Sequence, residues 1–279
     1  MFCLAGRWHI LAVENNQVAG VILTLKARVA QFMKRRRAAR IFGVNFVRSS
    51  SFELPRTVRL NGVDHPLSVP AEAGQRDAFV ELLLDDCYQL RTLAKRGRRI
   101  DRILDIGANA GLFGVAARAA FPYAKIHAYE PNAALEPYLA QQARFVGADY
   151  FIEAVGREAG LISLDIGPQS VMSTTRSDPK GTVAQIPFGE TLKRLGGHVD
   201  LVKMDCEGAE WEIFEDPESW RHVDYLTMEY HLSTNQDHDA ISTVLRSLGF
   251  DVTSQRKVTN FGLVFASRTK TSSDRASSR

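Results

Sequence analysis

Beyond residue 100, short apolar runs alternate with longer segments whose apolar positions recur every three or four residues. The short runs predict buried strands, and the longer segments predict amphipathic helices such as "GLFGVAARAAF" (111–121). Strands that alternate with helices indicate a parallel sheet covered by helices on both faces. The predicted strands are "RILDIG" (102–107), "KIHAYE" (125–130), "DYFIEAV" (149–155), "LISLDIG" (161–167), "VDLVKMD" (199–205) and "VDYLTMEYH" (223–231).

The C-terminal part departs from this alternation. After a helical pattern at 239–250, "FDVTSQRK" (250–257) and "GLVFASR" (262–268) follow each other closely. Two strands with so short a gap join as an antiparallel hairpin, because a parallel crossover needs about a dozen residues or more. The sequence therefore predicts an α/β fold: a doubly wound, seven-stranded, mostly parallel sheet with an antiparallel C-terminal strand.

The first third of the chain has a different pattern. Residues 9–40 and 75–96 show helical spacing, and Asn61-Gly62 lies between two β-like runs, which predicts a hairpin. We expect a basic N-terminal extension with helix and hairpin over 1–75, one large domain over 76–268, and a polar, disordered tail over 269–279.

Charge is unevenly distributed, although the net charge is only +3. Residues 1–100 hold 17 lysines and arginines against 8 acidic residues, whereas the remainder holds 18 against 24. The densest basic run is "KRRRAAR", Lys34–Arg40. A solvated helix face is the favoured interpretation of this run. Contact with an anionic membrane surface or a phosphate-rich partner is the functional alternative.

Composition narrows the setting. With 45% hydrophobic and 24% charged residues, the chain is typical of a soluble globular protein. No apolar run reaches the roughly 18 residues of a spanning helix, and the first residues lack the features of a secretory signal. Cys3, Cys87 and Cys206 match neither a disulfide framework nor a zinc site. We therefore expect a cytoplasmic protein without a bound metal.

A glycine-containing loop, "ILDIGANAGLFG", joins a core strand to a helix. Gly107 allows a turn without a Cβ clash, and Gly111 lets the helix start lie close to the strand or to a ligand. Free N–H groups at such a helix start suit an anionic group. Glu130 ends the next strand, 23 residues beyond Gly107, where an acid can accept both hydroxyls of a ribose. Asn109 stands where dinucleotide-binding loops carry their second glycine, and an antiparallel terminal strand is typical of S-adenosylmethionine-dependent methyltransferases.

Four segments together carry a resemblance to a known family: "LDIGANAGLF", "AYEPN", "DLVKMDCEGAEW" and "GLVFASR". Over residues 76–268 the chain resembles the FkbM family of methyltransferases. The resemblance implies the Rossmann-like class I methyltransferase fold and S-adenosyl-L-methionine as the cofactor. It also implies the cofactor-binding residues: Asp105, Gly107, Asn109 and Gly111 around the methionine part, Glu130 at the ribose hydroxyls, and Asn132, Ala154 and Val155 at the adenine.

Charged residues end two of the buried strands. In a doubly wound sheet, ligands bind beyond the carboxyl ends of the strands. Side chains alternate along a strand, and the strand order of the family makes these two strands neighbours. We therefore expect one rim to hold Lys203, Asp205, Glu207, Glu229 and His231, with Lys203 paired to Glu229 or Asp205.

Three roles for this rim stay open. In catalysis, Asp205 or His231 would act as the base on an acceptor hydroxyl, with Lys203 offsetting the acids. In metal binding, the carboxylates and the imidazole suit Mg²⁺ or Mn²⁺. In the third interpretation, Glu207 and Glu210 are acids favoured at a helix N-terminus, and His231 is a histidine satisfied at a strand end.

The expected function is methyl transfer to a hydroxyl oxygen. The family resemblance implies a small-molecule or glycan acceptor: a sugar, a glycolipid or a secondary metabolite. The basic first third motivates an alternative, a nucleic-acid methyltransferase, but "DCEG" stands where base methyltransferases carry an Asn/Asp-Pro-Pro-aromatic turn. Nucleic acid is therefore the less favoured acceptor. A nucleotide-cofactor-binding module without catalysis is the other alternative.

Overall fold

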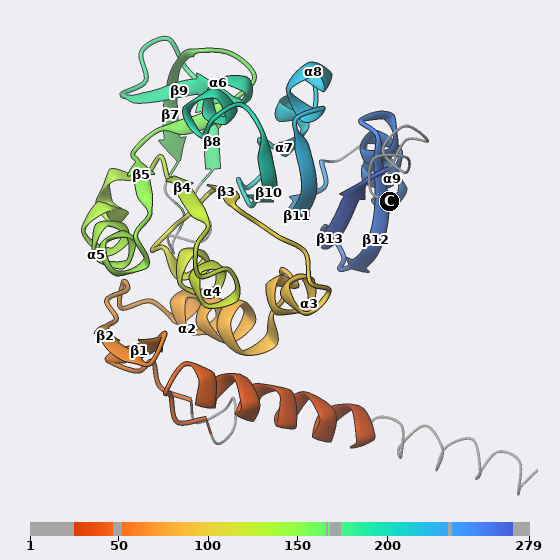
Figure 1. Cartoon of the computed structure of the whole chain (residues 1–279). Helices are drawn as coiled ribbons and strands as arrows, with labels where there is room; N and C mark the ends of the chain where they lie inside the picture. The colour runs from red at the N-terminus through yellow and green to blue at the C-terminus, as the bar shows by residue number, and fades with distance from the viewer. Residues whose placement is uncertain (1–24, 47–51, 166, 168–173, 234–235, 270–279) are drawn as a thin grey trace, which may run out of the picture.

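The computed structural model describes residues 25–46, 52–165, 167, 174–233 and 236–269 (Figure 1). At its centre is a seven-stranded sheet of order β12-β13-β11-β10-β3-β4-β5. Of these seven strands, β13 runs antiparallel to both of its neighbours, while the other pairs are parallel. The predicted fold class is therefore confirmed. The strands are β3 (Arg102–Ile106), β4 (Lys125–Tyr129), β5 (Asp149–Phe151), β10 (Val199–Met204), β11 (Val223–His231), β12 (Phe250–Lys257) and β13 (Phe261–Arg268).

Helices bury both faces of this sheet. Alternate side chains such as Ile103 and Leu201 pack with the helices of one face, and Leu104, Val202 and Leu226 pack with those of the other. Strands buried on both faces have nearly continuous apolar sequences, which is why these strands could be predicted. The first face carries α3 (Leu90–Lys95) and α4 (Leu112–Ala120); the second carries α6 (Phe188–Arg194), α7 (Glu210–Ile213), α8 (Pro217–Trp220) and α9 (His238–Ser247). Between β4 and β5 lie η3 (Ala133–Leu135) and α5 (Glu136–Val146).

A second, four-stranded sheet lies beside α6 at the top of Figure 1. Its strands, in the order β6-β9-β7-β8, are β6 (Ala154–Gly156), β9 (Val183–Pro187), β7 (Gly160–Asp165) and β8 (Thr174–Ser177). The single strand predicted at 149–155 is thus two strands in two sheets. Strands β8 and β9 were not predicted, because "TTRS" is polar and "VAQIP" lacks a continuous apolar run.

The N-terminal region contains the predicted hairpin. Strands β1 (Thr57–Leu60) and β2 (Val63–Pro66) pair antiparallel, and the φ angles of Asn61 and Gly62 are +51° and +84°, as a two-residue hairpin turn requires. Residues 25–41 form a helix along the bottom of Figure 1; the expected helix over 9–24 and the tail beyond 269 lie outside the described residues.

The helix predicted over 75–96 is interrupted. It consists of α2 (Ala73–Phe79), the π-helix η2 (Val80–Asp85) and α3. Between η2 and α3, Asp86 and Gln89 adopt φ angles of +55° and +59°, and Asp86 Oδ1 accepts a hydrogen bond from the N–H of Arg91 at 3.1 Å. The domain boundary at residue 75 stays a prediction, and α2 runs across it.

Candidate active site

A cavity of about 400 Å³ opens at the carboxyl ends of the central strands. One part of its wall is the bend after β3, and another is the segment that follows β10. Strand β6 and the α2–η2 segment close the remaining sides. This is the edge at which doubly wound sheets bind their ligands.

Close approach of two strand ends explains the first glycine of the bend. Gly107 has a φ angle of +74°, and a Cβ atom there would lie 1.8 Å from the carbonyl oxygen of Asp205. Asn109 also has a positive φ angle, +48°, which asparagine tolerates better than most residues. Its Oδ1 accepts hydrogen bonds from the N–H of Ala110 at 2.8 Å and from Nε2 of Gln75 at 2.7 Å. The asparagine at the second glycine position therefore has a structural reason.

The carboxylate of Glu130 is held at this bend. Its Oε2 accepts a hydrogen bond from the N–H of Asn109 at 2.8 Å, and its Oε1 accepts one from the N–H of Asn132 at 2.8 Å. Glu130 is 7% exposed and lines the cavity. Burial raises the pKa of its carboxyl, although the two N–H groups oppose this shift. Glu130 thus lies where the sequence placed the acceptor of a ribose diol.

Other predicted cofactor residues divide into two groups. Ala154 and Val155 line the cavity, as do Gly107 and Asn109. Gly111 does not; a Cβ atom there would lie 3.1 Å from side-chain atoms of α5, so this glycine serves helix packing.

Asp105 and Asn132 also lie outside the described wall of the cavity. Asp105 is fully buried beneath the bend. The side chain of Asn132 accepts a hydrogen bond from the N–H of Ala134 at 3.1 Å and so caps η3. Direct contact of these residues and of Gly111 with the cofactor stays a prediction; their buried positions indicate support of the bend and of Glu130.

Lys203 forms an ion pair that differs from the predicted one. Its Nζ lies 3.1 Å from Asp105 Oδ1, so the predicted pairing with Asp205 or Glu229 is wrong. Asp105 lies opposite Lys203 in the register of β3, which pairs directly with β10 on the side away from β11. Burial alone would lower the pKa of Lys203, but the charges of Asp105 and Asp205 outweigh it and raise the pKa.

The lysine ammonium also supports the bend. It donates hydrogen bonds to the carbonyl oxygens of Ile106 at 3.2 Å and of Gly107 at 2.5 Å. Lys203 is 3% exposed. We therefore interpret Lys203 as a positioning residue that compensates the buried Asp105, rather than as a group that reacts with substrate.

Acidic residues dominate the cavity wall. The described lining residues include seven acids and one lysine, Lys203, which is already paired with Asp105. Sequence reasoning missed the α2–η2 part of this wall, including Gln75 and Glu81. Its only signal was a glutamate inside the apolar helical pattern "FVELLL". The seven acids are Asp77, Glu81, Glu130, Glu153, Asp205, Glu207 and Glu229.

Asp205 and Glu207 follow β10 directly. Asp205 Oδ2 accepts a hydrogen bond from the hydroxyl of Tyr88 at 2.9 Å. Glu207 has a φ angle of +52°, a conformation that costs a non-glycine residue about 1–2 kcal/mol. Such strained residues cluster at functional sites.

Glu207, Glu229 and His231 gather at the predicted rim. His231 Nε2 lies 3.4 Å from Glu207 Oε2 and 3.7 Å from Glu229 Oε1, and its Nδ1 lies 3.4 Å from Glu210 Oε1. Burial raises the pKa of Glu207 to about 7. Burial and the charge of Asp205 raise the pKa of Glu229 to about 8.

The surroundings of His231 disfavour its predicted role as the base. Burial lowers the pKa of the imidazole, but the hydrogen bond to Glu210 and the charges of Glu207 and Glu210 outweigh this effect and raise the pKa to about 9. A protonated imidazole has no lone pair to accept a proton. His231 is also absent from the described lining of the cavity. The candidate bases are therefore the lining carboxylates.

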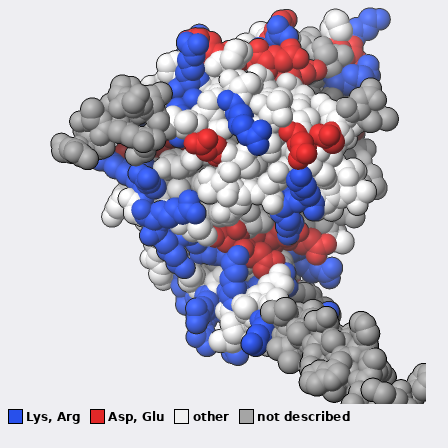
Figure 2. All heavy atoms as spheres, turned by 90° about the vertical axis from the view of Figure 1, so that its right-hand side faces the viewer, with Lys and Arg blue, Asp and Glu red and all other residues white. Residues whose placement is uncertain are grey.

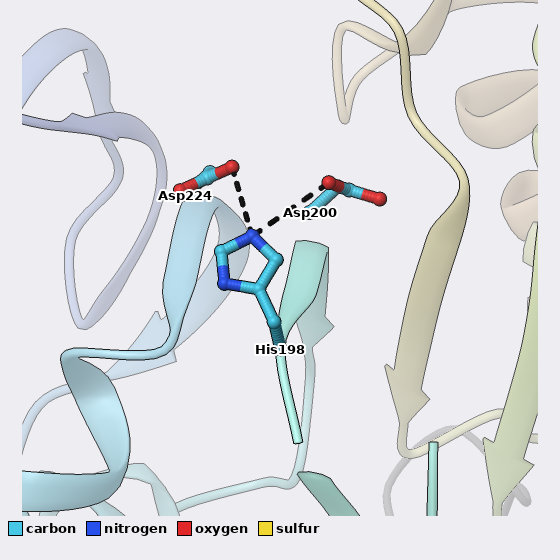
Figure 3. Close-up of side chains that lie close together, drawn as sticks. All are labelled: His198, Asp200 and Asp224. Atoms are coloured by element: carbon cyan, nitrogen blue, oxygen red, sulfur yellow. Dashed lines mark hydrogen bonds and ion pairs between the residues drawn. The ribbon is translucent and has the colours of Figure 1, made fainter. Parts of the chain in front are cut away.

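The metal hypothesis for this rim finds no support in its geometry. Among the described residues, only His198, Asp200 and Asp224 bring three ligand atoms within 4.8 Å of one another (Figure 3). These residues lie at the amino ends of β10 and β11, away from the cavity. His198 Nε2 contacts Asp224 at 3.1 Å, while Asp200 Oδ2 accepts two backbone N–H bonds, both of 2.7 Å, at the start of β3. These contacts thus link the amino ends of β10, β11 and β3.

The cavity fits S-adenosylmethionine by the chemistry of its walls. Glu130 offers carboxylate oxygens to a ribose diol. The first turn of α4, where Leu112 and Phe113 line the cavity, offers backbone N–H groups to a carboxylate. Ala154 and Val155 give an apolar border for a purine. All three features face one cavity, and a methyl group held there would face the acidic wall.

Comparisons with known proteins identify the family. The model of the methyltransferase FkbM domain matches residues 105–252. Methyltransferase sdnD of Sordaria araneosa is 26% identical over 219 residues, which cover 64% of this chain and 83% of that protein. Methyltransferase 1 of Beauveria bassiana (strain ARSEF 2860) is 25% identical over 213 residues, which cover 63% and 81%. Among solved structures, magnesium protoporphyrin IX methyltransferase (ChlM) from Synechocystis PCC 6803 with bound SAM matches at 12% identity and a TM-score of 0.42, covering 70% of this chain and 80% of that one.

Proposed function

Because the chain belongs to the FkbM methyltransferase family and is an S-adenosylmethionine-dependent methyltransferase, we propose that it methylates a hydroxyl oxygen of a small molecule or glycan. One observation carries the proposal: a single cavity joins the bend and Glu130 to the carboxylates of Asp205, Glu207 and Glu229. The first group suits the cofactor, and the second suits an acceptor that must lose a proton.

The residues on the cofactor side would bind and orient S-adenosylmethionine. Glu130 would hold the ribose diol, and the N–H groups in the first turn of α4 would hold the carboxylate. S-adenosylmethionine, when bound, supplies an electrophilic methyl group. Lys203 and Asp105 would keep the bend in place from below, because the lysine holds the carbonyl oxygens of Ile106 and Gly107.

Glu229 would take the proton of the acceptor hydroxyl. An alcohol is a weak nucleophile, and a general base that removes its proton speeds the reaction. The raised pKa of Glu229, about 8, makes it a stronger base than an ordinary carboxylate and matches the operating range of a general base. Asp205, oriented by the hydroxyl of Tyr88, would accept a hydrogen bond from the same acceptor.

The charge of the wall favours an uncharged or cationic acceptor. A phosphate or carboxylate group of an acceptor would find no unpaired lysine among the described lining residues, since Lys203 is already paired with Asp105. Hydroxyl groups of a sugar, a glycolipid or a secondary metabolite meet this condition. Nucleic acid, the alternative raised by the basic first third, does not.

The test follows the labelled methyl group into a product. Purified protein and methyl-labelled S-adenosylmethionine are incubated with a size-fractionated extract of the source cells, and the labelled product is identified by NMR and mass spectrometry. We expect an O-methyl group on a low-mass compound that carries no phosphate. Label in RNA, or on a nitrogen, would refute O-methylation of a small molecule. A Glu130→Gln variant provides the control for label transfer that does not depend on this cavity.

A further inference from the structure

The helix of residues 25–41 exposes a stripe of large apolar side chains. Leu25 is 60% exposed, Val29 53% and Met33 44%. These residues are four positions apart, so they lie on one face of the helix. Phe32, which is 37% exposed, borders the same face. A helix face in contact with water alone would carry polar residues at these positions.

The same helix is strongly basic. From residue 15 to residue 52 the sequence contains no aspartate or glutamate. Lys34 and Arg35 contact Asp85, and the guanidinium of Arg36 lies 5.8 Å from the centre of the Phe32 ring. In Figure 2, lysine and arginine side chains gather on the lower part of the molecule, where this helix runs in Figure 1. Its exposed cations are Lys26, Arg28, Lys34, Arg36, Arg37 and Arg40.

We propose that this helix lies on an anionic membrane surface. Leu25, Val29 and Met33 enter the boundary between the lipid headgroups and the acyl chains, and the arginines beside them contact lipid phosphates. An apolar stripe flanked by cations is the signature of a helix that binds in the plane of the interface. The helix does not span the membrane, because no helix among the described residues has the length and apolar character that a span requires.

The apolar stripe distinguishes a membrane from other anionic partners. Nucleic acid is bound mainly through its phosphates, so cations suffice and exposed Leu25, Val29 and Met33 have no partner there. A bilayer uses both features, since burial of the apolar side chains adds to the attraction between cations and anionic headgroups. The proposal is independent of the methyl-transfer reaction, because it concerns a surface that is separate from the cavity.

Contact with a membrane would also reach the cavity wall. Arg35 Nε and Asp85 Oδ1 lie 2.7 Å apart, and Asp85 ends η2. Two other η2 residues, Glu81 and Leu82, line the cavity. An ion pair between Arg35 and Asp85 therefore links the membrane-binding helix to η2, which forms part of the cavity wall.

The test measures sedimentation of the full chain with lipid vesicles. We expect binding to vesicles that contain phosphatidylserine, weak binding to vesicles of phosphatidylcholine alone, and loss of binding at high salt. The variant Val29→Asn/Met33→Asn removes two side chains of the stripe, and we expect it to weaken binding by at least about tenfold. The variant Arg36→Gln/Arg37→Gln should weaken binding by roughly 25-fold, since each of the two cations near an anionic surface contributes roughly a factor of five.

Matched variants control for general effects of substitution. Val63→Asn changes a 57% exposed valine in the β1–β2 hairpin, and Arg96→Gln/Arg98→Gln removes two exposed cations after α3. These controls should bind vesicles as the wild type does, and all variants should retain the circular dichroism spectrum. Equal binding to both kinds of vesicle would overturn the proposal. Retained binding by Val29→Asn/Met33→Asn would overturn it too, and competition by RNA in that case would identify a purely electrostatic surface.

Discussion

Lys203 Nζ lies 3.1 Å from Asp105 Oδ1, and both side chains are buried beneath the bend that forms the cofactor side of the cavity. Removing one partner leaves the other as an uncompensated buried charge, which typically costs about 3–5 kcal/mol. We therefore expect Lys203→Met to lower the free energy of unfolding by about this amount, measured by urea denaturation.

The double variant Lys203→Met/Asp105→Leu provides the matched control. Replacing a buried ion pair by apolar residues of similar volume is often neutral, so this variant should recover most of the stability that Lys203→Met loses. If the losses of Lys203→Met and of the single variant Asp105→Leu simply add in the double variant, the ion pair has no coupling energy.

Gly107 should tolerate no side chain. The variant Gly107→Ala would bring Cβ within 1.8 Å of the carbonyl oxygen of Asp205, so the ends of β3 and β10 must separate. Gly197 has a similar φ angle, +88°, but an added Cβ would have no atom within 4 Å. Gly197→Ala should therefore cost only the conformational strain, about 1–2 kcal/mol, and Gly107→Ala clearly more. Thermal unfolding compares the two, and calorimetry should show weaker S-adenosylhomocysteine binding for Gly107→Ala alone.

Glu130 should control affinity for the cofactor. A hydrogen bond to a charged group contributes about 1.5–3 kcal/mol, so Glu130→Gln should weaken S-adenosylhomocysteine binding by roughly 10- to 100-fold. Glu207→Gln, on the acceptor side of the same cavity, should leave this affinity within about threefold, a change of under 1 kcal/mol. Calorimetric titration with S-adenosylhomocysteine measures both. Equal effects of the two substitutions would contradict the assignment of Glu130 to the ribose.

Glu229 should control the chemical step. If it is the general base, Glu229→Gln should lower kcat by about 10²- to 10⁴-fold while cofactor affinity stays unchanged. The rate of the wild type should rise with pH through about 8, because Glu229 must lose its proton before it can accept one. Glu218→Gln, at an exposed position on α8, should keep the wild-type rate and profile. A wild-type rate that falls across this pH range would exclude Glu229 as the base.

The charge network around His231 should make stability depend on pH. The folded-state pKa of His231, about 9, is above its ordinary value of 6.5, so the folded state binds this proton more tightly than the unfolded state does. The resulting stability is fully present below pH 6.5 and is lost as pH rises through about 9. The raised pKa values of Glu207 and Glu229 act in the same direction. The stability that each carboxyl contributes is present at low pH and is lost as pH rises through about 7 for Glu207 and about 8 for Glu229.

Urea denaturation over this pH range measures the effect. The unfolding free energy of the wild type should fall from pH 6.5 to pH 9, and His231→Asn should reduce this slope. His222→Asn, at an exposed position just before β11, is the matched histidine control and should keep the wild-type slope. An unchanged slope in His231→Asn would mean that the proton is held elsewhere.

The strands of the main sheet could be predicted because burial on both faces leaves a continuous apolar run in the sequence. The bend and Glu130 could be predicted because backbone geometry and hydrogen bonding demand particular residue types there. The pairing of Lys203 was wrong because only β11 was considered as the neighbour of β10, although Asp105 on β3 has the matching register.

The α2–η2 wall was missed for a different reason. Its cavity-facing residues, such as Gln75 and Glu81, have no motif, and their role depends on a tertiary contact far along the sequence. Asp86 and Gln89 have left-handed backbones that a helical pattern of apolar positions does not reveal.

Part of the cavity wall lies outside the segment that matches the FkbM domain. The segment from Gly74 to Tyr88 that borders the cavity precedes residues 105–252, which match the shared FkbM domain. Substitutions in that segment can change the shape of the cavity while residues 105–252 stay unchanged. The acceptor selectivity of this chain can therefore change through residues that lie outside its matched FkbM segment.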